Sequence, residues 1–239
     1  MRIDASNLDF KELNEKIRAS KDKEFVVENT LGHRYIGCGS KDLSFKITGI
    51  PGNALGAYLN GSKIEVLGNS SDALGDTMND GLIVIHGNSG DACGYSMRGG
   101  KIYVKGSVGY RCGIHMKAYM DKYPIIIVGE NAGSFLGEYQ AGGIIIVLGL
   151  NNLDKIVGNF PSTGMYGGKL FLRSKCDGIR FPEHVDVNLA SDNDLAEIKE
   201  YLEEYSKIFN LDFNEIINHE FSVVTPNHNK KVKTMYVEN

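Results

Sequence analysis

The chain has 239 residues and a formal net charge of −4, which argues against a basic surface for nucleic acid or anionic membranes. Its apolar runs are too short to span a bilayer, and its four cysteines form no C-x-x-C pair, so we expect a cytoplasmic protein without a zinc or thioredoxin motif. Glycine is abundant, at 29 residues, and tryptophan is absent, which predicts many tight turns.

The first predicted element is a short amphipathic helix near the N-terminus. Phe10, Leu13 and Ile17 recur there at helical spacing. We assign residues 1–30 to an N-terminal helical cap, which would cover the open end of the structure that follows.

Seven strand-like segments come next, and each has apolar residues at alternate positions, as expected for a strand with one buried face. They read SFKITG, KIEVLG, LIVIHG, KIYVKG, IIIVGE, IIIVLG and KLFLRS. They close at Gly49, Gly68, Gly87, Gly106, Gly129, Gly149 and Ser174, in steps of 19, 19, 19, 23, 20 and 25 residues. This regularity indicates an internal repeat.

Two further columns of residues recur between these segments. One consists of Leu55, Leu74, Cys93, Cys112 and Leu136, each followed by a glycine for which we expect a positive φ. The other consists of Leu59, Met78, Met97, Met116, Gln140 and Met165. Because one such repeat cannot bury its apolar face alone, the pattern predicts an all-β fold over residues 31–180. We expect a single-stranded right-handed β-helix (β-solenoid) of about seven coils, with short helical N- and C-terminal caps.

The last predicted element is a longer helix that begins after Ser191. Leu195, Ile198 and Leu202 fall on one face of it. We assign residues 181–239 to a C-terminal helix and tail.

Two pairs of chemically reactive residues share columns of the repeat. Cys93 and Cys112 could be small core residues or a dithiol, and core packing is the favoured interpretation. Asp72 and Asp91 could bind Ca²⁺ or cleave a polysaccharide, but turn-forming aspartates are favoured because the next repeat has Tyr110 there. The sequence therefore offers no catalytic, cofactor-binding or metal-binding residues.

The most promising polar surface lies around an insertion at residues 118–123. Arg111, His115, Lys117, Tyr119 and Tyr123 add basic groups and two tyrosines to this edge. The stretch contains Tyr, Arg and Met, which are residue types enriched in interface centres. We predict that these five residues contact a partner subunit or another copy of the chain.

The recurrent pattern quoted as GYSMRGGKIYVKG and GEYQAGGIIIVLG resembles the GXGXG domain of glutamate synthase, in its stand-alone subunit form. The segment HVDVNLASDNDLAEIKEYLEEY, followed by FSVVTP, is similar to the tail of the large chain of that enzyme. Gln140 and Ser174 depart from the pattern. The resemblance implies a multi-subunit enzyme that makes glutamate from glutamine, 2-oxoglutarate and a reductant. It also implies a glutamine amidotransferase partner and a synthase partner that holds FMN and iron–sulfur clusters.

The function predicted on this basis is a non-catalytic scaffold subunit of a glutamate synthase, an oxidoreductase, with no cofactor in this chain. One alternative is the similar β-helical subunit of formylmethanofuran dehydrogenase, which carries the same repeats. Another is a polysaccharide-acting enzyme, although the lack of tryptophan makes a sugar-stacking platform harder to build.

Overall fold

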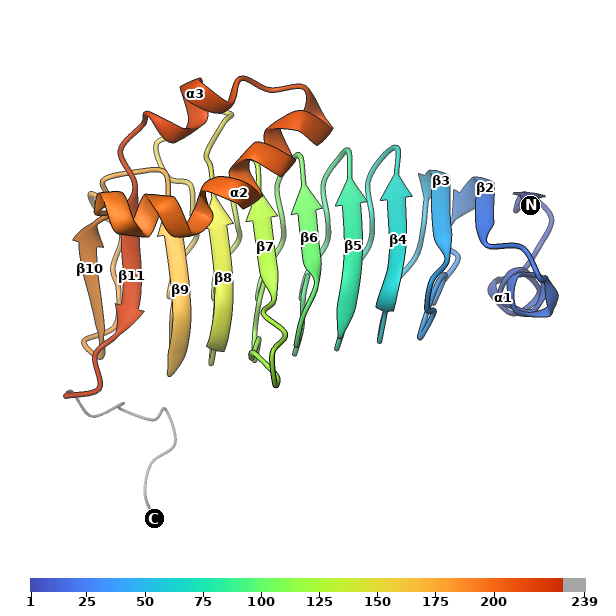
Figure 1. The fold of residues 1–239 in the computed structure, drawn as a ribbon, viewed down its shortest axis with the longest axis horizontal. Coiled ribbons are helices and arrows are strands. Elements are labelled where there is room, and N and C mark those ends of the chain that lie inside the picture. Colours follow the sequence, from blue (N-terminus) through green and yellow to red (C-terminus); the bar gives the residue numbers. More distant parts are fainter. Residues whose placement is uncertain (230–239) are drawn as a thin grey trace, which may run out of the picture.

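A computed structural model of the chain, which describes residues 1–229, contains one long open sheet with two C-terminal helices on one face and an N-terminal helix across one end (Figure 1). The strands follow the order β1-β2-β3-β4-β5-β6-β7-β8-β9-β11-β10. They are β1 (Arg2–Asp4), β2 (Glu24–Leu31), β3 (Ser44–Ile50), β4 (Asn60–Val66), β5 (Asp80–Ile85), β6 (Lys101–Val104), β7 (Ile125–Val128), β8 (Ala141–Val147), β9 (Gly167–Leu172), β10 (Val185–Leu189) and β11 (Ser222–Pro226). The helices are α1 (Phe10–Ala19), α2 (Asp192–Phe209) and α3 (Phe213–Ile217).

The predicted all-β, single-stranded β-helix of about seven coils is wrong. The regular structure is a single 11-stranded sheet in which β1 to β9 are parallel and β10 and β11 are antiparallel. Three helices accompany the sheet within the described residues. The stretches between strands carry alternating positive φ angles, so they are turns and do not build a second or third sheet. The terms "β-helix" and "solenoid" therefore do not describe this architecture.

A turn-rich return segment leads from each strand to the next, and neighbouring return segments are joined by backbone hydrogen bonds. In one of them Ala92, Gly94 and Ser96 have φ angles of 56°, 69° and 50°. The N–H of Gly94 donates to the preceding segment, at Leu74 (2.8 Å), whereas that of Ala92 donates to the following one, at Tyr110 (2.7 Å). The positive φ predicted for the glycine column is confirmed, with values between 63° and 69° at Gly56, Gly75, Gly94, Gly113 and Gly137.

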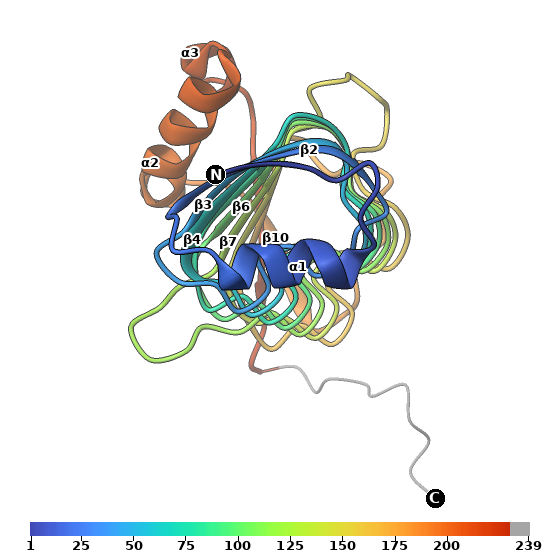
Figure 2. The same cartoon turned by 90° about the vertical axis from the view of Figure 1, so that its right-hand side faces the viewer.

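The main hydrophobic core lies between the sheet and the return segments, as the view along the stack shows (Figure 2). The methionine column and the leucine–cysteine column are buried there, as predicted. Gln140 replaces a methionine in the core, and its side-chain nitrogen donates to the carbonyl oxygens of Gly142 and Gly143 at 3.3 and 3.0 Å. The repeat therefore accommodates a polar residue by satisfying its donor locally.

The observed register corrects the spacing of the repeats. Ile102 pairs with Ile126, and Ile126 pairs with Ile145, so these two steps are 24 and 19 residues and not 23 and 20. The residue that follows the β7 pattern is therefore Glu130 and not Gly129. The extra residues of the longer step fall in the 118–123 insertion. One 19-residue step follows it, and the step from Ile145 to Leu170 is then 25 residues.

A second hydrophobic core lies on the other face of the sheet, under α2 and α3. Tyr103, Ile127, Ile146 and Phe171 project from the outer face of β6 to β9 into this core. The predicted C-terminal helix is confirmed: it starts at N-cap Ser191, which forms a capping box with Asp194. It covers this outer face and does not close the end of the stack, which β11 and β10 do instead (Figure 1).

The N-terminal helix is also confirmed, with Asp9 as its N-cap and Leu13 and Ile17 buried. The proposed boundary between residues 30 and 31 cuts through β2, however. This strand pairs with β1 on one side and β3 on the other, so the sheet starts within the segment assigned to the N-terminal cap.

Candidate functional site

Arg111 was predicted to face a partner, and the structure gives it an internal role as well. Its Nε donates to Oε2 of Glu138 at 3.2 Å, and the Glu138 side chain is only 6% exposed. The Arg111 guanidinium carbon also lies 4.9 Å from the ring centroid of Phe135, on which Phe160 stacks at 5.3 Å. Arg111 therefore neutralises a buried carboxylate and begins a row that continues over two phenylalanine rings.

His115 is held in a second aromatic row. Its ring stacks on Tyr139 with centroids 5.2 Å apart and planes 9° apart, and Tyr95 meets it edge-on at 6.0 Å. The backbone of His115 has a φ of 55°, and this turn conformation directs the side chain outward. Packing of the rings fixes this part of the surface in one conformation.

The 118–123 insertion forms a small loop whose ends meet in a bridge between Tyr119 and Lys122. Lys122 reaches back to Asp80, at 3.2 Å, and so anchors the loop on an earlier repeat. At its tip Tyr119 is 50% exposed and Met120 is 84% exposed. The loop is thus attached at its base and offers a tyrosine and a methionine to the solvent.

The five predicted interface residues lie on a return segment, on the adjoining loop and just before β7. Arg111, His115 and Lys117 share one return segment, and Tyr119 lies on the adjoining loop. Tyr123 lies beyond it, where burial raises the pKa of its hydroxyl and Glu197 of α2 adds to the shift. Contact of these residues with a partner stays a prediction.

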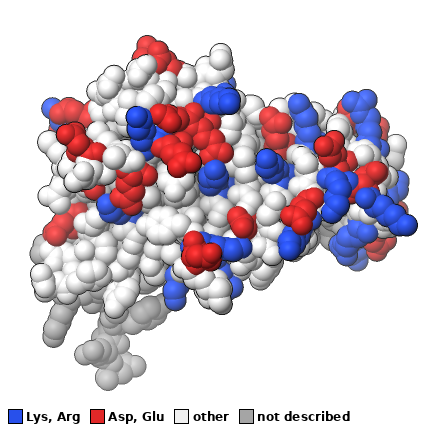
Figure 3. Space-filling view, in the orientation of Figure 1, with Lys and Arg blue, Asp and Glu red and all other residues white. Residues whose placement is uncertain are grey.

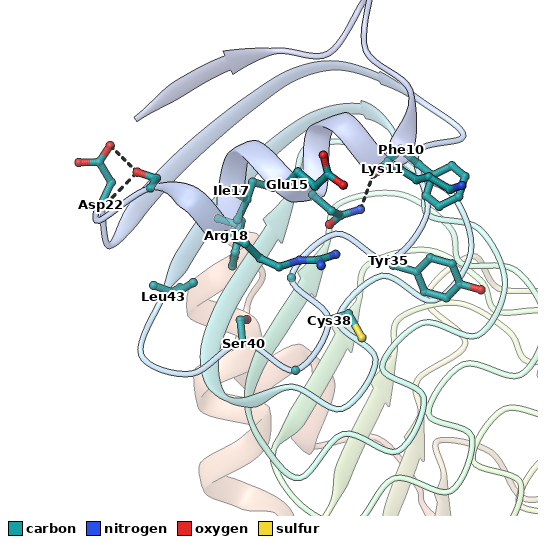
Figure 4. A pocket seen from close by; sticks show the side chains of 15 residues that line it. Phe10, Lys11, Glu15, Ile17, Arg18, Asp22, Tyr35, Cys38, Ser40 and Leu43 are labelled. Atoms are coloured by element: carbon teal, nitrogen blue, oxygen red, sulfur yellow. Dashed lines mark hydrogen bonds between the residues drawn. The ribbon is translucent and has the colours of Figure 1, made fainter.

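A hollow of about 810 Å³ lies at the N-terminal end, between α1 and the first return segment (Figure 4). Arg18 extends across it above Cys38, and its apolar wall includes Ile17 and Phe45. Burial raises the pKa of the Cys38 thiol although Arg18 opposes the shift, so the thiol is not activated. Sequence reasoning missed this hollow, because its lining comes from two segments that carry no common motif.

A second hollow, of about 680 Å³, lies near the C-terminal end of the stack. Its lining comes from three segments, at residues 131–132, 155–160 and 178–180. Lys155 and Arg180 belong to this lining, which contains no acidic residue. The sequence pattern does not reveal it, because the segment between Leu150 and Met165 departs from the repeat.

The paired cysteines and aspartates have structural roles. Cys93 and Cys112 are buried free thiols, and a hydrogen bond between them together with burial raises the pKa of Cys112. Oδ1 of Asp72 accepts a hydrogen bond from the N–H of Asp91, and Oδ1 of Asp91 accepts one from that of Tyr110, at 2.9 and 2.8 Å. The aspartates thus support the turns, as the favoured interpretation predicted.

Within residues 1–229, no group of three or more His, Cys, Asp or Glu side chains is arranged to hold a metal ion. No helix in the same range has the length and apolarity needed to cross a membrane.

The repeated glycine-cornered return segments and the sheet they support define a class of protein. The GXGXG motif family model matches residues 16–234, and the chain belongs to this family. It is 46% identical over 238 residues to Uncharacterized protein MJ1350 of Methanocaldococcus jannaschii, with 94% of this chain and 91% of that protein covered. A solved structure with a similar fold is a chain of the formyltransferase/hydrolase complex from Methylorubrum extorquens, in complex with methylofuran. The TM-score is 0.66 at 17% identity, with 97% of this chain and 93% of that chain covered.

Proposed function

We propose that this chain is a docking subunit of a multi-subunit enzyme complex and that partner subunits supply the catalytic groups. The observation that carries the proposal is the fold that it shares, over 97% of its length, with a chain of the formyltransferase/hydrolase complex. The exposed tyrosines of the return segments, together with Tyr119 and Met120 of the 118–123 loop, belong to residue types that protein interfaces favour. A long, rigid stack can present separate surfaces to more than one partner.

The first candidate complex is one that handles formyl groups, as the name of the similar solved structure suggests. This chain would then take the place that the similar chain has in the formyltransferase/hydrolase complex. The similar subunit of formylmethanofuran dehydrogenase would have the corresponding place in its own complex. The similarity of chain lengths, with 93% of the other chain covered, supports a subunit of the same extent.

The second candidate is glutamate synthase, and the specific observation in its favour is the family assignment. The match covers residues 16–234 and therefore includes the C-terminal segment that resembles the glutamate synthase tail. In that case FMN and iron–sulfur clusters would belong to a synthase partner, and glutamine cleavage to an amidotransferase partner.

Co-expression with the products of neighbouring genes tests the proposal. We expect a complex of defined stoichiometry, while the isolated chain neither hydrolyses glutamine nor retains a flavin absorption band. Glutamine-dependent glutamate formation by the complex would select glutamate synthase, and formyl transfer or hydrolysis would select the first candidate. Turnover by the isolated chain in either assay would contradict the docking role.

A further inference from the structure

Short backbone bridges form a ladder beside the main sheet, and this ladder ends at Val157. Ser89 pairs with Val108, Val108 with Ala132, and Ala132 with Val157, all in parallel. At each step the backbone of one residue bonds to the segment that follows: Val108 donates to Asn131 O at 2.9 Å and accepts from the N–H of Gly133 at 3.0 Å. Ala132 likewise donates to Ile156 O at 3.0 Å and accepts from the N–H of Gly158 at 2.9 Å.

By the same alternation, the N–H and C=O of Val157 point away from Ala132, toward the position of the next segment. No residue among 1–229 forms a hydrogen bond with either group. Val157 is only 4% exposed as a whole residue, and the backbone donor and acceptor of such a residue usually have partners. The hollow of about 680 Å³ lies at this edge, with Val157 and residues 178–180 both in its lining. Residues 178–180 form no backbone hydrogen bond with Val157.

The charge of the hollow is uniform. Lys155 and Arg180 are both exposed, and neither forms an ion pair with a described residue. Phe160, which is 61% exposed, offers an apolar ring at one end and stacks on Phe135. An unpaired strand edge, two cations and one ring thus converge in a chain that is acidic overall.

We propose that an extended acidic segment of a partner subunit adds to this ladder as its next member. Its backbone pairs with Val157, its carboxylates meet Lys155 and Arg180, and an apolar side chain packs on Phe160. Addition of a strand to an open edge is a recurrent mode of peptide recognition, in which the backbone provides affinity and the side chains provide specificity. The inference rests on the proposed docking function and names one of its contacts.

An acidic partner fits this edge better than two other occupants do. Residues 230–239 of this chain include three lysines and one glutamate, so their charge is the same as that of the hollow. A second copy of this chain would have to offer another surface to the hollow, such as the acidic face of α2. Such a head-to-tail contact repeats from copy to copy without limit unless its rotation closes a ring.

The first test uses the intact chain and synthetic hexapeptides followed by NMR. We expect the alternating Glu-Val hexapeptide to bind and to shift the amide resonances of residues 155–160. The Lys-Val hexapeptide should bind at least about tenfold more weakly, since two favourable charge pairs become repulsive. N-methylation of the alternate peptide amides that pair with Val157 should abolish binding. N-methylation of the intervening amides should leave binding unchanged. Equal binding of free glutamate would identify a small-anion site and overturn the proposal.

The second test separates this inference from the proposed function by using the co-expressed complex. Lys155→Glu with Arg180→Glu should release the partner that carries the acidic segment. The matched control, Lys21→Glu with Lys23→Glu, makes the same charge change at the opposite end and should leave assembly intact. Full assembly of the Lys155→Glu/Arg180→Glu variant would overturn the inference and leave the docking function standing. Failure of the unmodified chain to form any complex would contradict the docking function itself.

Discussion

Tyr103 on β6 donates its hydroxyl hydrogen to Oε2 of Glu204 on α2 across 2.7 Å, and Lys101 of the same strand reaches the same oxygen at 2.5 Å. Lys101 occupies a strand position that recurs along the sheet, with Lys63 on β4 and Lys169 on β9 at the same register. Lys169 bonds Asp194 and Glu197 near the start of the helix. Figure 3 shows the resulting mixture of acidic and basic side chains on this face. The repeat therefore positions α2 through ion pairs as well as through the apolar face of the helix.

These contacts give the docking of α2 a defined pH dependence. Burial opposes ionisation of Glu204, but hydrogen bonds from Lys101 and Tyr103 outweigh it and hold the pKa of Glu204 below its usual 4.5. A carboxyl whose pKa is depressed in the folded state contributes stability that is complete above its unfolded pKa and is lost as the pH falls through the folded value. We expect α2 to loosen below about pH 4.5, which tyrosine near-UV circular dichroism would detect.

Glu204→Gln should reproduce this loosening at neutral pH and cost about 1–2 kcal/mol, because it removes the charge that Lys101 faces. Glu203→Gln is the matched control, since Glu203 is exposed and its nearest cation, Lys199, lies 3.8 Å away. Urea unfolding of both variants at pH 7 measures the difference. Equal stability of the two variants would show that the ion pair contributes nothing to docking.

The glycine column is constrained by contact as well as by conformation. Gly75 has a φ of +63°, and a Cβ there would lie 2.5 Å from Cδ1 of Ile102. We expect Gly75→Ala to cost about 1–2 kcal/mol for the left-handed conformation and about 1–3 kcal/mol more for overpacking. Gly39→Ala provides the control, because its φ is +65° but nothing lies within 4 Å of the added carbon.

A rescue separates these two contributions. Ile102→Val removes the clashing methyl group, so Gly75→Ala combined with Ile102→Val should lose less stability than the sum of the two single changes. Thermal unfolding of the four chains gives this coupling. Strict additivity would mean that the glycine is required for its φ alone.

The alternation of apolar residues was sufficient to predict β3 to β9 and the columns of the main core, but β1, β2, β10 and β11 were not predicted. It did not predict the overall architecture, because residues such as Ala92 and Ser96 adopt positive φ without any compositional signal. Glu130 is the position after β7 that corresponds to the closing glycines, but the sequence pattern indicates Gly129 because it is a glycine one residue earlier. Gly129 has a different role, since the hydroxyl of Tyr205 approaches the backbone there. The edge at Val157 depends on pairing between distant segments, which one sequence does not encode in a local pattern.

The methionine column tests the main core. Met97 is fully buried between Met78 and Met116 of the neighbouring repeats. Met97→Asp should destabilise the fold by at least about 4 kcal/mol, because a carboxyl without a partner enters an apolar environment. Met97→Leu nearly conserves volume and should cost less than about 1.5 kcal/mol. Wild-type stability of Met97→Asp in thermal unfolding would contradict the observed register.

The predicted docking edge needs a test that spares the Arg111–Glu138 pair. Arg111→Glu would place two carboxylates together, one of them in the buried Glu138 side chain, and should cost about 1–3 kcal/mol or more. A loss of assembly by that variant would therefore reflect misfolding as readily as a lost contact. The loop at residues 118–123 provides a cleaner probe, because the Tyr119 and Met120 side chains are exposed and neither neutralises a buried carboxylate.

Tyr119→Ser with Met120→Ser removes the two exposed side chains at that tip and leaves the Lys122–Asp80 anchor in place. If the loop contacts a partner, these residue types are the ones expected to dominate the contact, and assembly with co-expressed subunits should weaken by at least about tenfold. Tyr58→Ser is the control, since Tyr58 is 55% exposed on a distant return segment. Circular dichroism should report an unchanged fold in all three chains. If the folded loop variant assembles as tightly as the control, the partner does not bind at Tyr119 or Met120, and the predicted contact at this loop is wrong.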